Sequence, residues 1–113
     1  MKESKLDKAV FELQAQICKT LANPTRLMII HTLRDGEKSV GELAAILGLR
    51  QANLSQHLTI MRQTQILKAR KQGANIFYSV ANPKINDACD TVREVLIQLL
   101  DQNQQIAGTF ANH

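Results

Sequence analysis

The stretch LGLRQANLSQHLTIMRQ, residues 47–63, decides the fold of this chain. Leu54, Leu58 and Met61 recur in it at helical spacing, which predicts an amphipathic helix over about residues 51–64. An exposed helix face usually carries Glu and Lys, because these residues favour helix and pair four residues apart. This helix carries amides and hydroxyls instead, so its outer side is unlike an ordinary solvated face.

A projection of this helix at about 100° per residue separates two sides. The apolar side is expected to face the core, with His57 at its edge, while Ile60 falls on the polar flank and blurs the division. The polar side consists of Gln51, Ala52, Asn53, Ser55, Gln56, Thr59, Arg62 and Gln63. In a DNA major groove Gln and Asn can bind base edges bidentately, Ser and Thr can bind phosphate or base, and Ala can touch a thymine methyl.

The segments before this helix predict three more helices. Apolar spacing indicates a first helix over about residues 4–21. Asn23 followed by Pro24 combines a capping side chain with a proline at the first helical position, and so starts a second helix. Ser39 and Glu42 form the capping box of a short third helix.

Two β-rich strings follow the quoted stretch and predict a hairpin with a four-residue loop, QGAN, in a region of about residues 66–80. A second Asn-Pro pair at residues 82–83 starts a last amphipathic helix, and residues 105–113 are expected to be a flexible tail. This order of elements is that of a winged helix-turn-helix. We therefore expect a mainly α fold with five helices and a small β-hairpin, in a single domain over residues 1–104.

Composition and charge limit the partners of the chain. With 113 residues and 44% hydrophobic content it can form one largely aliphatic core, and it contains no apolar run of the roughly 20 residues that span a bilayer. The polar N-terminus is unlike a signal peptide, so we expect a cytoplasmic protein without a membrane partner. Residues 43–86 hold six Lys and Arg and no acid, a distribution that favours a polyanion such as DNA.

The hairpin is basic beside its turn. Lys68, Arg70 and Lys71 can reach phosphates there, which position a protein on DNA without reading sequence. A solvated basic strand is the alternative for any one of the three residues and is weaker for the set.

Three segments, LANPTRLMIIHTL, SVGELAAILGLRQANLSQHLTIMRQ and KARKQGANIFYSV, resemble the ArsR/SmtB family of bacterial and archaeal repressors over about residues 10–100. The resemblance implies a homodimeric winged-helix repressor that leaves its operator DNA when it senses an inducer, usually a metal ion or an oxidising sulfur species. Two positions depart from the common pattern. Arg50 stands where a capping Ser or Thr is usual, and Gln65 where a Gly usually ends the recognition helix.

A homodimer also has a physical basis independent of the family. Both terminal helices carry apolar surfaces wider than one small core can cover, so we expect them to form a dimer interface. A two-fold dimer would present its recognition helices to half-sites about 34 Å apart, which is one turn of DNA.

The sensing chemistry is less constrained. The third-helix string VGELAAIL lacks thiols and the last helix lacks histidine, so we expect no metal site of the family type and no cofactor. Cys18 and Cys89 remain as candidate sensor thiols for sulfane sulfur, an oxidant or a thiophilic metal such as arsenic. Plain packing is the alternative, since free cysteine is among the most often buried residues.

The remaining histidines leave open roles. His31 lies in an apolar helix and is expected to be a core or interface residue rather than a ligand, whereas His57 supports the fold or donates to a phosphate. We find no pair of nucleophile and base and no phosphate-binding glycine loop, so no enzyme is expected. The prediction is a sequence-specific DNA-binding repressor. The alternative is a thiol-based redox or thiophilic-metal binding protein that uses the winged helix for protein association.

Overall fold

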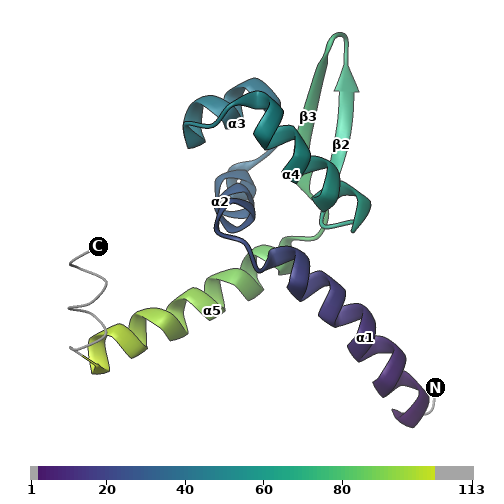
Figure 1. Ribbon diagram of the computed structural model, residues 1–113, viewed down its shortest axis with the longest axis vertical. Helices are drawn as coiled ribbons and strands as arrows, with labels where there is room; N and C mark the ends of the chain where they lie inside the picture. The colour runs from purple at the N-terminus through teal and green to yellow at the C-terminus, as the bar shows by residue number, and fades with distance from the viewer. Residues whose placement is uncertain (1–2, 104–113) are drawn as a thin grey trace.

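The computed structural model describes the backbone of residues 3–103 and the side chains of residues 7–103. Its elements, shown in Figure 1, are α1 (Glu3–Leu21), α2 (Pro24–Thr32), a 3₁₀ turn η1 (Leu33–Asp35), β1 (Lys38–Ser39), α3 (Val40–Leu47), α4 (Gln51–Gln63), β2 (Leu67–Gln72), β3 (Asn75–Val80) and α5 (Pro83–Gln102). The prediction of five helices with a β-hairpin in a winged helix-turn-helix is confirmed. The expected flexible tail lies outside the described residues.

The helices begin where local capping chemistry predicts. Asn23 caps α2 and Asn82 caps α5, each followed by a proline, and each side-chain oxygen accepts a hydrogen bond from a backbone N–H of the first turn. At α3 the Ser39 hydroxyl accepts from the Glu42 N–H at 3.1 Å, and the Glu42 carboxylate accepts from the Ser39 N–H at 2.9 Å. The predicted capping box is therefore formed.

The wing differs from its prediction in two respects. It is a three-stranded antiparallel sheet in the order β1-β3-β2, and β1 was not expected because two residues carry no readable periodicity. The predicted four-residue loop was wrong, because Gln72 and Asn75 pair across the strands and leave a turn of two residues. Gly73 adopts a φ of +61° in that turn, a conformation that glycine allows without steric cost.

The core is small and lies among α2, η1, α3, α4 and the base of the wing. Leu54, Leu58 and Met61 are fully buried, as the projection of α4 predicts. The other buried apolar side chains are Ile29, Ile30, Leu33, Leu43, Ala44, Ile66, Leu67 and Tyr78. None of these residues comes from α1 or α5.

The terminal helices α1 and α5 extend away from this core in different directions, and we call them the arms (Figure 1). No residue of α5 is buried, and Thr20 is the one buried residue among the described side chains of α1. In the described part of the chain no helix is both long enough and apolar enough to cross a membrane.

Candidate nucleic-acid interface

The outer side of α4 carries the residues predicted to bind DNA, and we call this set the reading face. Every member of the set is exposed, while the opposite side of the helix is buried in the core. The reading face consists of Gln51, Ala52, Asn53, Ser55, Gln56, Thr59 and Arg62. The core therefore orients α4 so that its amides and hydroxyls face solvent as a group.

Both ends of α4 differ from ordinary helix ends. Arg50 precedes the helix in an extended conformation, makes no side-chain cap, and no acid lies in the first turn. The first N–H groups and the positive end of the helix dipole are thus available to an anion such as a phosphate. After the helix, Gln65 has a φ of 65°, the left-handed conformation in which the resemblance leads one to expect glycine.

His57 connects the recognition helix to the helices before it. The Arg26 Nε donates to His57 Nδ1 at 3.1 Å, and the Arg26 Nη1 donates to the backbone oxygen of Thr20 at 3.1 Å. Partial burial lowers the pKa of His57, and the positive charge of Arg26 lowers it further, so the imidazole is neutral and can accept this bond. Of the two roles left open by the sequence, the structure favours support of the fold.

The wing presents Lys68, Arg70 and Lys71 on its exposed surface, as predicted. Arg70 is nevertheless held within the protein, because its guanidinium forms a bidentate ion pair with Glu37, with Nε to Oε2 at 3.1 Å. Its Nη1 also donates to the Gln72 amide oxygen at 2.7 Å, and the guanidinium carbon lies 5.0 Å from the centre of the Phe77 ring.

Glu37 changes the charge of the wing that the sequence predicted. It lies outside the acid-free segment of residues 43–86, yet the fold places its carboxylate beside Arg70. The hydrogen bonds from Arg70 hold the pKa of Glu37 below its usual range, so this acid is ionised at neutral pH. Lys68 and Lys71 make no ion pair within the described residues, which leaves them as the more available cations of the wing.

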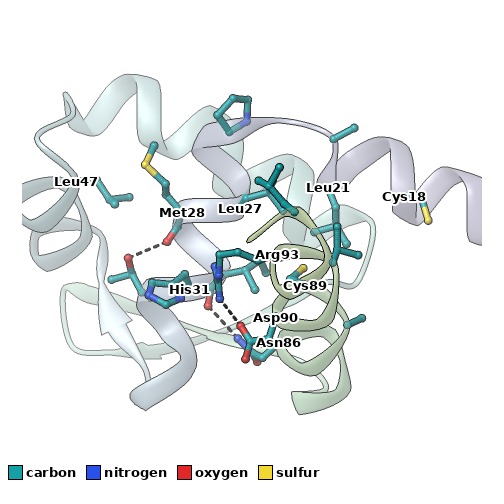
Figure 2. A pocket seen from close by; sticks show the side chains of 17 residues that line it. Cys18, Leu21, Leu27, Met28, His31, Leu47, Asn86, Cys89, Asp90 and Arg93 are labelled. Carbon is teal, nitrogen blue, oxygen red and sulfur yellow. Dashed lines mark hydrogen bonds and ion pairs between the residues drawn. The ribbon is translucent and has the colours of Figure 1, made fainter. Parts of the chain in front are cut away.

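The two candidate sensor thiols line one cavity of about 860 Å³, which α1, α2 and α5 border (Figure 2). Cys18 is exposed on α1, Cys89 is half-buried on α5, and both are free thiols. Burial raises the pKa of Cys89, and the nearby charge of Asp90 raises it further. His31 also lines this cavity and is exposed, so the prediction of a core position was wrong and an interface position stays a prediction.

Polar contacts at the edge of this cavity tie α5 to the core. Asp90 pairs with Arg34 of η1 and with Arg93 of its own helix, and the Asn86 amide donates to the Ile30 carbonyl oxygen at 3.0 Å. These contacts join positions 56 residues apart, so no local sequence signal predicts them. No group of three or more His, Cys, Asp or Glu side chains in the described part of the chain lies close enough to hold a metal.

Comparison with known proteins agrees with this geometry. Residues 23–69 match the family model described as "Bacterial regulatory protein, arsR family". The chain is 38% identical over 92 residues to the uncharacterized HTH-type transcriptional regulator Rv0081 of Mycobacterium tuberculosis, covering 80% of this chain and 81% of that one. The crystal structure of Rv0081 superposes with a TM-score of 0.75 at 36% identity, covering 85% of this chain and 97% of that one.

Other relatives are named for opposite regulatory effects. The transcriptional repressor PagR of Bacillus anthracis is 38% identical, covering 74% of this chain and 84% of its own length. The transcriptional activator HlyU of Vibrio cholerae is 34% identical, covering 73% of this chain and 76% of its own length. A homodimeric winged helix-turn-helix DNA-binding domain from Mycobacterium bovis has a TM-score of 0.77 at 26% identity, covering 87% of this chain and 91% of that one.

Proposed function

The chain belongs to the arsR family of bacterial regulatory proteins and is a DNA-binding transcriptional regulator, and from this premise we propose that it is a homodimeric, sequence-specific repressor. The observation that carries the proposal is the two-sided structure of α4. Its apolar side is fully buried in the core, while its exposed side offers amides and hydroxyls and no acid. Such a side suits base edges, whose donors and acceptors Gln and Asn can satisfy in pairs.

The arms support the homodimer. They carry exposed apolar side chains that the core does not use, and contiguous surface of this kind marks an interaction site. On α1 these residues are Val10, Phe11, Leu13 and Ile17, and on α5 they are Val92, Val95, Leu96, Ile97 and Leu99. Pairing of the arms with those of a second copy would bury both sets and present two reading faces to one duplex.

Repression rather than activation is proposed because PagR, a relative that this chain matches over most of its length, is named a repressor. A reporter strain tests the direction. It carries the chain's own upstream region before a reporter gene, with and without the chain supplied in trans. Repression predicts reporter activity that falls when the wild type is supplied and stays high with a Gln56→Ala variant. Increased reporter activity with the wild type would make the protein an activator.

Release of the DNA is proposed to follow from thiol chemistry at Cys18 and Cys89. Both side chains line the cavity beside the arms, so a bond at either sulfur would change the surface that pairs with a second copy. Joining two thiols as a disulfide releases two protons and two electrons, and a polysulfide accepts both and leaves as hydrogen sulfide and a shorter polysulfide. The raised pKa of Cys89 makes the exposed Cys18 the better first site of attack.

A DNA-binding titration under reductant, and then with polysulfide, oxidant, arsenite or zinc, tests this step. The thiol proposal predicts that polysulfide weakens binding by the wild type and leaves Cys18→Ser and Cys89→Ser unaffected. Serine keeps the size of each side chain, so binding under reductant should not change in either variant. If polysulfide weakens binding equally in all three proteins, the thiols are packing residues and not sensors.

A further inference from the structure

Ile60 is the one member of the outer side of α4 that the DNA-binding residues do not account for. With Ser55, Gln56 and Thr59 it lines a shallow hollow of about 430 Å³ on that side of the helix. Its side chain is 38% exposed, whereas the core residues of the same helix are fully buried. An isoleucine therefore forms part of the surface that is proposed to meet DNA.

The dimer surface does not explain this exposure. Most of the large apolar residues that the described part of the chain exposes lie on α1, α2 and α5, which border the cavity of the two thiols. Three lie elsewhere: Ile46 on α3, Ile60 on α4 and Ile76 on β3. Of these three, Ile60 is the one that lies beside the reading face.

Thr59 adds a second apolar group to the hollow. Its hydroxyl donates to the Ser55 carbonyl oxygen at 2.8 Å, so the donor of this side chain is already committed to the helix backbone. What Thr59 can offer DNA is its methyl group and a remaining acceptor lone pair. The hollow thus combines an apolar part, from Thr59 and Ile60, with the amide of Gln56.

Thymine is the base that presents a methyl group in the major groove, beside the O4 acceptor. We infer that Ile60 is a specificity-determining residue that contacts a thymine methyl in each half-site, beside the base pair that Gln56 reads. This inference rests on the proposed DNA-reading role of α4 and adds the base class that one position of the site requires. It also gives a role to the residue that blurs the two-sided pattern of the helix.

Replacing single thymines by deoxyuridine tests the inference, because this change deletes the methyl group and keeps the base-pair hydrogen bonds. A specific site is first selected from random duplexes with the full-length wild type. Each thymine of a half-site is then replaced in turn. We expect one position at which the wild type loses about fourfold in affinity, the loss that follows from uncovering one methyl group.

The matching variants are Ile60→Ala, Ile60→Val and the control Ile46→Ala, which truncates an exposed isoleucine on α3. Ile60→Ala should bind thymine and deoxyuridine duplexes equally at that position, and Ile60→Val, the milder change, should retain part of the difference. Ile46→Ala should retain all of it. Thermal unfolding of each variant shows that the comparison is made on folded protein.

Two results would overturn the inference and leave the regulator function intact. In the first, the wild type selects a specific site but no deoxyuridine substitution changes its affinity, or the site has no thymine. In the second, Ile60→Ala and Ile60→Val keep the full thymine preference, which would assign the methyl contact to Ala52 or Thr59. If selection yields no specific site at all, the proposed function fails rather than the role of Ile60.

Discussion

Gln65 occupies a backbone conformation that disfavours it. At a φ of 65° a side chain crowds the following carbonyl oxygen, a cost of about 1–2 kcal/mol for residues other than glycine. Glycine relieves this cost but increases the entropy of the unfolded chain. We therefore expect Gln65→Gly to raise the free energy of unfolding by about 0.5–1 kcal/mol, measured by urea denaturation. Gln65→Ala, which keeps the Cβ, should give no such gain, and equal stabilisation by both variants would contradict the strain.

Glu37 weakens the wing as a cationic surface. Removing its charge in Glu37→Gln frees Arg70 for phosphate, so we expect tighter binding to any duplex and a salt dependence that steepens by about one unit. The measurement is the slope of log affinity against log salt on random DNA. Glu12→Gln on α1 removes the same charge from an exposed position outside the wing and should change neither quantity. If the two variants behave alike, Glu37 does not restrain Arg70.

His57 gives stability a specific pH dependence. Its folded pKa lies below the ordinary value of 6.5, so the unfolded chain takes up a proton more readily than the folded one. The contribution of this group is therefore complete above about pH 6.5 and is lost as the pH falls from there through the folded pKa. Chemical denaturation at pH 7.5 and 5.5 should show a smaller loss for His57→Gln than for the wild type. His31→Gln serves as the control and should lose as much as the wild type.

At the scale of elements, local chemistry is readable in the sequence and distant contacts are not. Asn23, Ser39 and Asn82 mark helix starts because a cap acts within three residues, and the structure bears out all three. The buried side of α4 follows from helical periodicity alone. Strand β1 was missed because it exists only through pairing with β3, more than thirty residues later.

The candidate site was predictable to the same degree. The exposure of the reading face follows from the periodicity of one helix, and the structure agrees with it. The ion pair of Glu37 with Arg70 and the hydrogen bond of Arg26 with His57 join residues about thirty positions apart, and residue types alone do not indicate such pairs. The sequence therefore identifies which residues face outward, and the structure adds which of them are already held.

At the scale of the whole molecule, two arms without a core of their own require a second copy. Val92 on α5 is 69% exposed and apolar, and Val92→Asp would place a charge in the proposed interface. We expect this variant to sediment as a monomer at concentrations at which the wild type is a dimer, measured by analytical ultracentrifugation. Ile46→Asp on α3, 57% exposed, is the matched control and should remain dimeric. A wild type that is monomeric at high concentration would contradict the homodimer.

Sequence-specific reading of DNA by α4 is the central claim, and an equilibrium titration of the selected duplex against a scrambled one tests it most directly. The wild type should prefer the selected duplex by about a thousandfold or more at physiological salt. Gln56→Ala should lose about 1–3 kcal/mol on the selected duplex and little on the scrambled one. Equal affinity of the wild type for both duplexes, or an equal loss by Gln56→Ala on both, would contradict the claim.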